Sequence, residues 1–240
     1  MIKIAHLYYD LMNLYGDNGN IKILKQALEN QGISTSIEFL SVDDKINFDD
    51  FDIIYIGPGT YNNEKIVLNN ILKYKNDIQK AINNNVFFLI TGNALDLFGK
   101  EILDDNSKIE GLGIFEFNIN KTMNRLVGEV YAKSNNLNDY ILGFKNQDSI
   151  LETKMESCLK IVKGYGFDSN SPNEGLLINN FFGTFLIGPL LVRNPELLIF
   201  LVKKIIDSKY DNFKYKPFNL DLEQKAHDEY IKNYFDKDTN

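Results

Sequence analysis

The chain has 240 residues, of which 44% are hydrophobic and 25% charged, and its formal net charge at pH 7 is −7. That length can bury one full α/β core, and an acidic balance without any basic cluster argues against a nucleic-acid-binding protein. A single cysteine rules out a disulfide framework within the chain and favours a reducing compartment. No signal peptide or membrane-spanning apolar run is recognisable, so we expect a cytoplasmic protein without a membrane span.

The first hundred residues alternate between expected strands and helices. Apolar, β-branched runs predict strands, and apolar residues spaced three or four apart predict helices. The predicted strands cover residues 2–8, 33–40, 51–56 and 86–91, and the predicted helices cover 21–31 and 64–83. This alternation is typical of a doubly wound, mostly parallel sheet. Glycine-rich turns follow residues 8, 56 and 91, and we expect them together at the carboxyl edge of the sheet, where ligands bind in such folds.

From residue 111 onward the pattern changes to shorter strands, which predict an antiparallel extension of the α/β fold. These strands are expected at residues 114–121, 128–133, 139–144 and 159–163. An apolar strand at 183–187 returns to the site edge, and Pro195 begins a helix that runs to about residue 207. We expect residues 1–207 to form one domain and residues 208–240 to form a C-terminal tail with a polar, amphipathic helix within 220–235.

Residues 86–99, VFFLITGNALDLFG, run from an apolar strand through small residues into a short helix. This is the local architecture of a nucleophile elbow, in which a sharp turn exposes one reactive side chain beside backbone N–H donors. Here the tip of the turn reads Thr91-Gly92-Asn93-Ala94 and contains neither cysteine nor serine.

Three blocks of sequence resemble the class I glutamine amidotransferases of the cobyric-acid-synthase type. The first block is HLYYDLMNLYGDNGN at residues 6–20, which follows the family opening D-L-x-N-x-Y-G-D-x-G-N. The second is the elbow, where the family has C-G-G-Y-Q-x-L-G. The third is FGTFLIGPLLVRNP at 182–195, similar to G-T-Y-x-H-G-P-x-L-x-x-N-P. The similarity extends from residue 2 to about 207, and within the family it is greatest to the GatD-type glutaminase subunits of lipid II isoglutaminyl synthase.

The resemblance implies that both catalytic side chains are missing. Anchored on Gly99, the register places Gly92 at the catalytic cysteine and Ile187 at the catalytic histidine. Asn93 and Ala94 replace two glycines, and Asp96 replaces a glutamine. In such enzymes a Cys thiolate attacks the glutamine amide and a His moves the proton. A hydrogen atom and an alkyl group do neither, so we expect no intact catalytic residue and no glutaminase activity from this site.

Two other groups are weak candidates for a nucleophile. Thr91 reaches the tip if the alignment is shifted by one residue, but it needs an adjacent base. Neither His6, at the end of the first strand, nor His227, in the tail, is well placed to be that base. Cys158 lies in a strand-like segment and is better explained as a structural cysteine.

The resemblance also implies a set of ligand-binding residues. Arg125 lines up with a family arginine that holds the substrate carboxylate, a task that suits a guanidinium; the alternative is an exposed surface arginine. The turn at 57–60 resembles the family turn that supplies an oxyanion-binding N–H, although Pro58 removes one donor; the alternative is an ordinary turn. The predicted ligand-binding residues are Arg125, Gly57, Gly59, Asn93 and Ala94. No residues have metal-ligand spacing, and no metal or cofactor is expected.

The function predicted first is a catalytically degenerate amidotransferase-like subunit that binds, scaffolds or regulates a partner. The resemblance implies that this partner is a Mur-ligase-type synthetase, MurT-like, which amidates the D-glutamate of the peptidoglycan stem peptide. Two alternatives stay open. One is an active glutaminase subunit with an unrecognised nucleophile, and the other is a non-catalytic sensor that binds glutamine or another small amino acid through Arg125.

Overall fold

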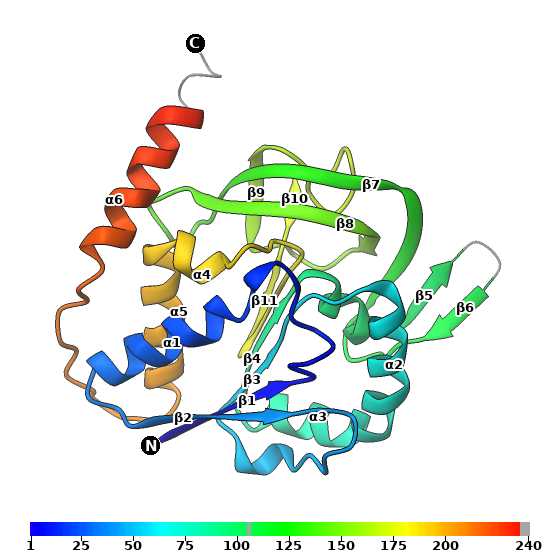
Figure 1. Ribbon diagram of the computed structural model, residues 1–240, viewed down its shortest axis with the longest axis horizontal. Coiled ribbons are helices and arrows are strands. Elements are labelled where there is room, and N and C mark those ends of the chain that lie inside the picture. The colour runs from blue at the N-terminus through cyan, green and yellow to red at the C-terminus, as the bar shows by residue number, and fades with distance from the viewer. Residues whose placement is uncertain (105–106, 236–240) are drawn as a thin grey trace.

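The computed structural model describes residues 1–104 and 107–235, and it contains two sheets that lie against each other (Figure 1). The first sheet has the strand order β11-β12-β4-β3-β1-β2, and all its strands run parallel except β11. Its strands are β1 (Ile2–Leu7), β2 (Thr35–Leu40), β3 (Ile53–Ile56), β4 (Phe87–Thr91), β11 (Leu176–Ile178) and β12 (Phe181–Thr184).

Helices cover both faces of this sheet, which explains why β3 and β4 are buried at every position. Alternate strand residues such as Ile54 and Ile56 pack with one set of helices, and Ile53 and Tyr55 pack with the other. The first set is α2 (Tyr61–Ile71), α3 (Lys75–Asn83) and the 3-10 segment η4 (Gly92–Phe98). The second set is α1 (Gly19–Asn30), α4 (Leu190–Arg193) and α5 (Pro195–Asp207).

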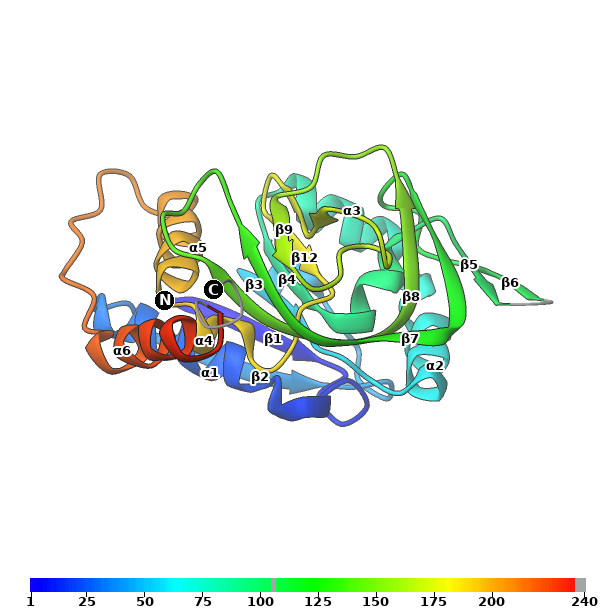
Figure 2. The same cartoon turned by 90° about the horizontal axis from the view of Figure 1, so that it is seen from above.

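The second sheet is dominated by a long antiparallel hairpin, which arches over the first sheet in Figure 2. Its strands are β5 (Glu101–Asp104), β6 (Ser107–Glu110), β7 (Phe117–Lys133), β8 (Ile141–Thr153), β9 (Leu159–Lys163) and β10 (Asn173–Glu174). A backbone bridge between Phe144 of β8 and Ile187 joins the hairpin to the segment that follows β12. The predicted α/β fold with an antiparallel extension is therefore confirmed.

Several predicted boundaries were wrong. The single helix expected at 64–83 is broken by a 3-10 turn at Leu72–Tyr74. Tertiary contacts explain the break, because the Tyr74 hydroxyl accepts the Ile46 N–H and its ring packs against Phe48. The short strands expected at 114–121 and 128–133 are one strand, β7, whose register shifts between Lys121 and Leu126. A β-bulge of this kind bends a strand without ending it.

The C-terminal part is an irregular segment followed by α6 (Asp221–Tyr230) and a π turn at Ile231–Phe235. Tyr210, Phe213, Tyr215 and Phe218 of the irregular segment are partly buried against the α1 and α5 side of the sheet. His227 of α6 lies 2.8 Å from the carbonyl oxygen of Tyr140 and so fixes the helix to the loop before β8. Among the described residues, no helix combines the length and the apolar character needed to span a bilayer.

Candidate functional site

The three glycine-rich turns meet at one edge of the first sheet because β4, β3 and β1 are parallel neighbours. The Leu14 N–H donates to the Pro58 carbonyl at 2.9 Å, which joins the turn after β1 to the turn after β3. The Gly59 N–H donates to the Asn93 side-chain oxygen, also at 2.9 Å, which joins the turn after β3 to the elbow after β4. The convergence expected from the pattern of strands is therefore confirmed.

The elbow keeps its backbone shape but has no room for a nucleophile. Gly92 is buried and has a φ of +62°, the left-handed conformation that glycine adopts without cost. A Cβ atom at this position would lie 2.6 Å from Cβ of Pro58 and 3.1 Å from Cγ2 of Ile187. The first distance is a steric overlap with a rigid ring. Pro58 and Ile187 therefore fill the space in which a nucleophilic side chain would stand.

Ile187 is held in place by its backbone as well as by packing. Its N–H donates to the Phe144 carbonyl at 3.0 Å, and its carbonyl accepts the Phe144 N–H at 3.3 Å. The side chain is buried. It closes the apolar side of the elbow and supplies no proton donor or acceptor.

Thr91 is fully buried, and its hydroxyl donates to a carboxylate oxygen of Asp17. Asp17 also accepts the Tyr55 hydroxyl at 2.9 Å and the Gly188 N–H at 3.1 Å. Burial raises the pKa of Asp17, although these hydrogen bonds oppose the shift. The threonine hydroxyl thus belongs to a closed polar cluster beneath the turn and does not face the site.

Neither histidine can activate a nucleophile at the elbow. The His6 ring is packed among the rings of Tyr9, Phe39 and Tyr55, and burial lowers its pKa to about 4. His227 contacts the loop before β8, as described above. Cys158 directly precedes β9 in the second sheet, and burial, followed by the charge of Glu174, raises the pKa of its thiol to about 12. A thiol with such a pKa is a poor nucleophile.

A cavity of about 290 Å³ lies beside Asn93 of the elbow. Its lining residues are Leu14, Tyr15, Gly59, Thr60, Tyr61, Asn93, Arg125, Asn146 and Asp148. Three of the five residues predicted to bind a ligand, Gly59, Asn93 and Arg125, are among them. Gly57 and Ala94 are not. A Cβ atom at Gly57 would lie 2.8 Å from the Tyr55 hydroxyl, and Ala94 packs in the core.

Arg125 extends from β7 at the rim of this cavity, and its side chain is 47% exposed. Its guanidinium donates to a carboxylate oxygen of Asp148 at 2.8 Å and to the side-chain and backbone oxygens of Asn146 at 2.9 and 3.0 Å. Arg125 thus lies at the rim of the cavity, where its guanidinium already holds a carboxylate from its own chain.

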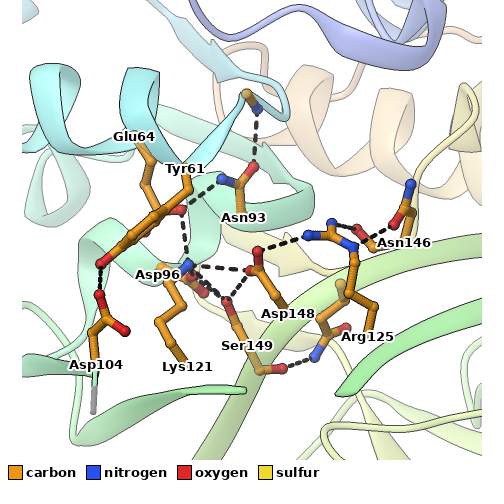
Figure 3. A network of polar contacts seen from close by, with 12 residues as sticks. Tyr61, Glu64, Asn93, Asp96, Asp104, Lys121, Arg125, Asn146, Asp148 and Ser149 are labelled. Carbon is orange, nitrogen blue, oxygen red and sulfur yellow. Dashed lines mark hydrogen bonds and ion pairs between the residues drawn. The ribbon is translucent and has the colours of Figure 1, made fainter. Parts of the chain in front are cut away.

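Behind the cavity, one ammonium group is shared among three carboxyl groups (Figure 3). Lys121 of β7 donates to Asp96 of η4 at 2.8 Å and to Glu64 of α2 at 2.9 Å, and Asp148 of β8 lies 3.4 Å away. Glu64 also accepts the Asn93 side-chain N–H at 2.6 Å. The network therefore connects both helical segments to the hairpin.

Burial sets the protonation of this network. Burial, and then the charge of Asp96, raise the pKa of Glu64 to about 8, while Lys121 opposes the shift. Burial likewise raises the pKa of Asp96. Burial alone would lower the pKa of Lys121, but the three carboxyl groups raise it above its ordinary value. Glu64 therefore takes up a proton at a higher pH than an exposed glutamate does, and Lys121 stays charged.

A second buried ion pair joins Lys145 to Glu174 and also engages Gln147. The Lys145 ammonium donates to Gln147 at 2.9 Å, to the Gly166 carbonyl at 2.5 Å and to Glu174 at 2.5 Å. Both charged side chains of the pair are fully buried. These residues stabilise the second sheet and have no access to the cavity.

Sequence reasoning missed Glu64, Lys121 and Asp148 as members of the site. They lie on three different elements, and no local motif joins them. Among the residues that the structure describes, no group of three or more His, Cys, Asp or Glu side chains is arranged to hold a metal ion.

Comparisons with known proteins find similar sequences along most of the chain. Residues 3–195 match the family of CobB/CobQ-like glutamine amidotransferase domains. The "Lipid II isoglutaminyl synthase (glutamine-hydrolyzing) subunit GatD" of Streptococcus pneumoniae is 31% identical over 234 residues, which are 95% of this chain and 90% of that protein. The protein of the same name from Staphylococcus aureus is 29% identical over 226 residues, covering 94% and 93% of the two chains.

Two solved structures share the fold at low sequence identity. A crystal structure of a glutamine amidotransferase superposes with a TM-score of 0.57 at 12% identity and covers 84% of this chain and 98% of its own. The glutaminase domain of Trypanosoma brucei CTPS with bound acivicin superposes with a TM-score of 0.54 at 10% identity, covering 90% of this chain and 97% of its own.

Proposed function

Since the chain belongs to the family of CobB/CobQ-like glutamine amidotransferase domains, we propose that it is a non-catalytic member that binds, scaffolds or regulates a partner. One observation carries the proposal. Gly92 stands at the nucleophile position of the elbow, and the place of a side chain there is occupied by Pro58 and Ile187. Amide hydrolysis through an acyl-enzyme needs a nucleophile and a proton carrier, and this site holds neither.

The partner we propose is a Mur-ligase-type synthetase, MurT-like. This proposal draws on the relatives, which are named as subunits of a lipid II isoglutaminyl synthase and are matched along most of their length. In such an assembly this chain keeps the surface of a glutaminase subunit without releasing ammonia from glutamine. It then acts on the synthetase through contact alone.

Two assays test the proposal. Purified protein is incubated with glutamine, alone and together with a MurT-like synthetase from the same host, and glutamate is measured. We expect no release above the buffer rate. Release that Thr91→Ala or Cys158→Ala abolishes would instead establish the active-glutaminase alternative. A pull-down from the host with the full chain as bait should recover a synthetase of the Mur-ligase type, and recovery of no synthetase would contradict the proposed partner.

A non-catalytic amino-acid sensor is the second candidate function. The exposed Arg125 guanidinium at the rim of a 290 Å³ cavity favours it, because a cavity of that size admits a small amino acid. Calorimetry with glutamine, with Arg125→Ala as the control, measures this binding. Heat of binding that is unchanged by the substitution would exclude a role for Arg125.

A further inference from the structure

The strand β2 is an open edge of the first sheet. It pairs with β1 on one side, and among the described residues no strand pairs with it on the other (Figure 2). The carbonyl oxygens of Ser34 and Leu40 accept N–H groups from β1 and from the residue after it. Because successive residues of a strand turn their backbone groups to opposite sides, those of Thr35, Ile37 and Phe39 point outward from the sheet.

This edge lacks the features that keep sheet edges apart. Natural edges are commonly short or bulged, or they carry lysine or proline, because an open edge can pair with another chain. The other terminal strands of the two sheets follow this rule: β10 has two residues, β11 has three, and β6 has four and contains Lys108. In contrast, β2 has six residues, TSIEFL, and its register with β1 is continuous.

Apolar side chains beside this edge are exposed. Phe39 is 54% exposed and Tyr9 is 41% exposed, and the centroids of their rings lie 5.4 Å apart. Ile37 shares the Phe39 face of the strand and is only partly buried. A second strand along β2 would therefore cover apolar surface as well as pair with the backbone.

The charges at the two ends of β2 indicate the direction of that second strand. At the amino end, the Lys216 ammonium lies beside Gly32, 3.1 Å from where a Cβ atom would stand. At the carboxyl end, three carboxylates and one lysine are exposed: Asp10, Asp43, Asp44 and Lys45. An antiparallel copy of the same strand brings its acidic end to the basic end of the first, so unlike charges meet at both ends.

We propose that β2 is an interface between two copies of this chain, whose β2 strands pair antiparallel across a two-fold axis at Ile37. In this register Ile37 lies opposite itself and Phe39 lies opposite Thr35, so the outward backbone groups of all three residues bond across the axis. A two-fold contact closes the assembly at two chains. The interface goes beyond the proposed function, and β1 and β3 separate it from the elbow strand β4.

Sedimentation velocity of the full chain tests the proposal. We expect the mass to shift from one chain to two as the concentration rises over about a hundredfold range, because dimerisation follows mass action. Phe39→Lys places a charge on the edge and should weaken association by about tenfold or more. Val162→Lys is the matched control: Val162 is 47% exposed on β9, and the same change there should leave association unchanged.

Three further measurements locate the interface. Ile37→Pro removes an outward N–H, which an edge strand tolerates, and should also prevent dimerisation. Hydrogen exchange within residues 35–40 of the unchanged chain should slow as the concentration rises. Lys216→Glu and Asp43→Lys should each weaken the dimer, and the two together in one chain should restore it, because the charges of both ends are then exchanged.

The proposal is overturned if the unchanged chain stays a monomer over this range, or if folded Phe39→Lys and Ile37→Pro proteins dimerise as well as it does. A charge exchange that does not restore the dimer would contradict the antiparallel pairing. Protection of residues 35–40 by a MurT-like synthetase, with no dimer of the chain alone, would assign the edge to that partner instead. None of these outcomes depends on glutamate release, so a failure here leaves the proposed non-catalytic function standing.

Discussion

Gly92 retains the left-handed backbone of an elbow (φ +62°), a conformation that costs other residues on the order of 1–3 kcal/mol. In an active elbow that strain is useful because it presents a reactive side chain. Here glycine relieves the strain, and Pro58 and Ile187 occupy the vacated volume. Restoring a cysteine and a histidine alone therefore does not restore a working pair, because the cysteine Cβ overlaps the proline ring.

Substitution of Gly92 by alanine measures this crowding. We expect Gly92→Ala to lower the free energy of unfolding by about 2–5 kcal/mol, the sum of backbone strain and overpacking. Gly16→Ala is a matched control, since Gly16 has a φ of +68° but no neighbouring atom within 4 Å of the position that a methyl group would take. Urea unfolding measures the loss in free energy of unfolding for both variants, and the difference between the two losses is the contribution of overpacking at Gly92. Equal losses in the two variants would show that the elbow has room after all.

Residue identities predict the absence of a catalytic pair, which stays a prediction, but they do not predict how the space around Gly92 is filled. Gly92 and Ile187 were identified from the motifs on either side of them. The contact of Pro58 with Gly92, and the hydrogen bond from the Gly59 N–H to Asn93, depend on how two turns pack across the sheet edge. No periodicity or motif encodes such a distance, so these contacts between the two turns could be found only from the structure.

At the scale of elements, the parallel strands were predictable because their apolar runs are short, continuous and separated by turn residues. The break between α2 and α3 could not be predicted, because the helical pattern of the sequence continues through the break. Contacts of Tyr74 with the loop before β3 outweigh that pattern. The full length of β7 could not be predicted, because polar residues around its bulge interrupt the pattern of a strand. One of them, Lys121, belongs to the buried network.

The network between α2, η4 and the hairpin makes stability depend on pH. Glu64 has a pKa of about 8 in the folded chain and 4.5 as its ordinary value, so the folded state holds a proton that the unfolded chain releases in this interval. The unfolded state binds fewer protons there, and stability falls as the pH rises from about 5 to about 8. Glu64→Gln removes this contribution.

We expect the stability of the unchanged chain, relative to Glu64→Gln, to fall by on the order of 1–3 kcal/mol across this interval. Urea unfolding at several pH values measures the difference. Glu110→Gln on β6, an exposed position, serves as the control and should leave the profile unchanged. A relative stability that rises with pH would mean that Glu64 is ionised in the folded chain.

At the scale of the whole molecule, the division predicted from the sequence, a domain at 1–207 and a tail at 208–240, stays a prediction. The tail covers apolar surface rather than completing the sheet: Leu220 and the aromatic residues of the irregular segment pack on the α1 and α5 side, and Phe235 packs against Tyr131. We therefore propose that residues 1–207 fold without it, at reduced stability.

Truncation after residue 207 tests that division. We expect a single cooperative transition with a melting temperature lower by roughly 6–12 °C, which corresponds to a loss of about 3 kcal/mol from uncovered apolar surface. Circular dichroism and calorimetry report the cooperativity of the transition and the melting temperature. A truncated chain without a cooperative transition would show that the tail is part of the domain.

We propose that the whole molecule is a subunit that has the amidotransferase fold but whose elbow does not form a covalent intermediate. The most direct measurement is intact mass spectrometry of the full chain after incubation with a glutamine-mimicking electrophile, alongside an active relative with its cysteine intact. We predict one adduct on the relative and an unchanged mass for this chain. A stoichiometric adduct that maps to Thr91, or to any other side chain at the elbow, would contradict the account.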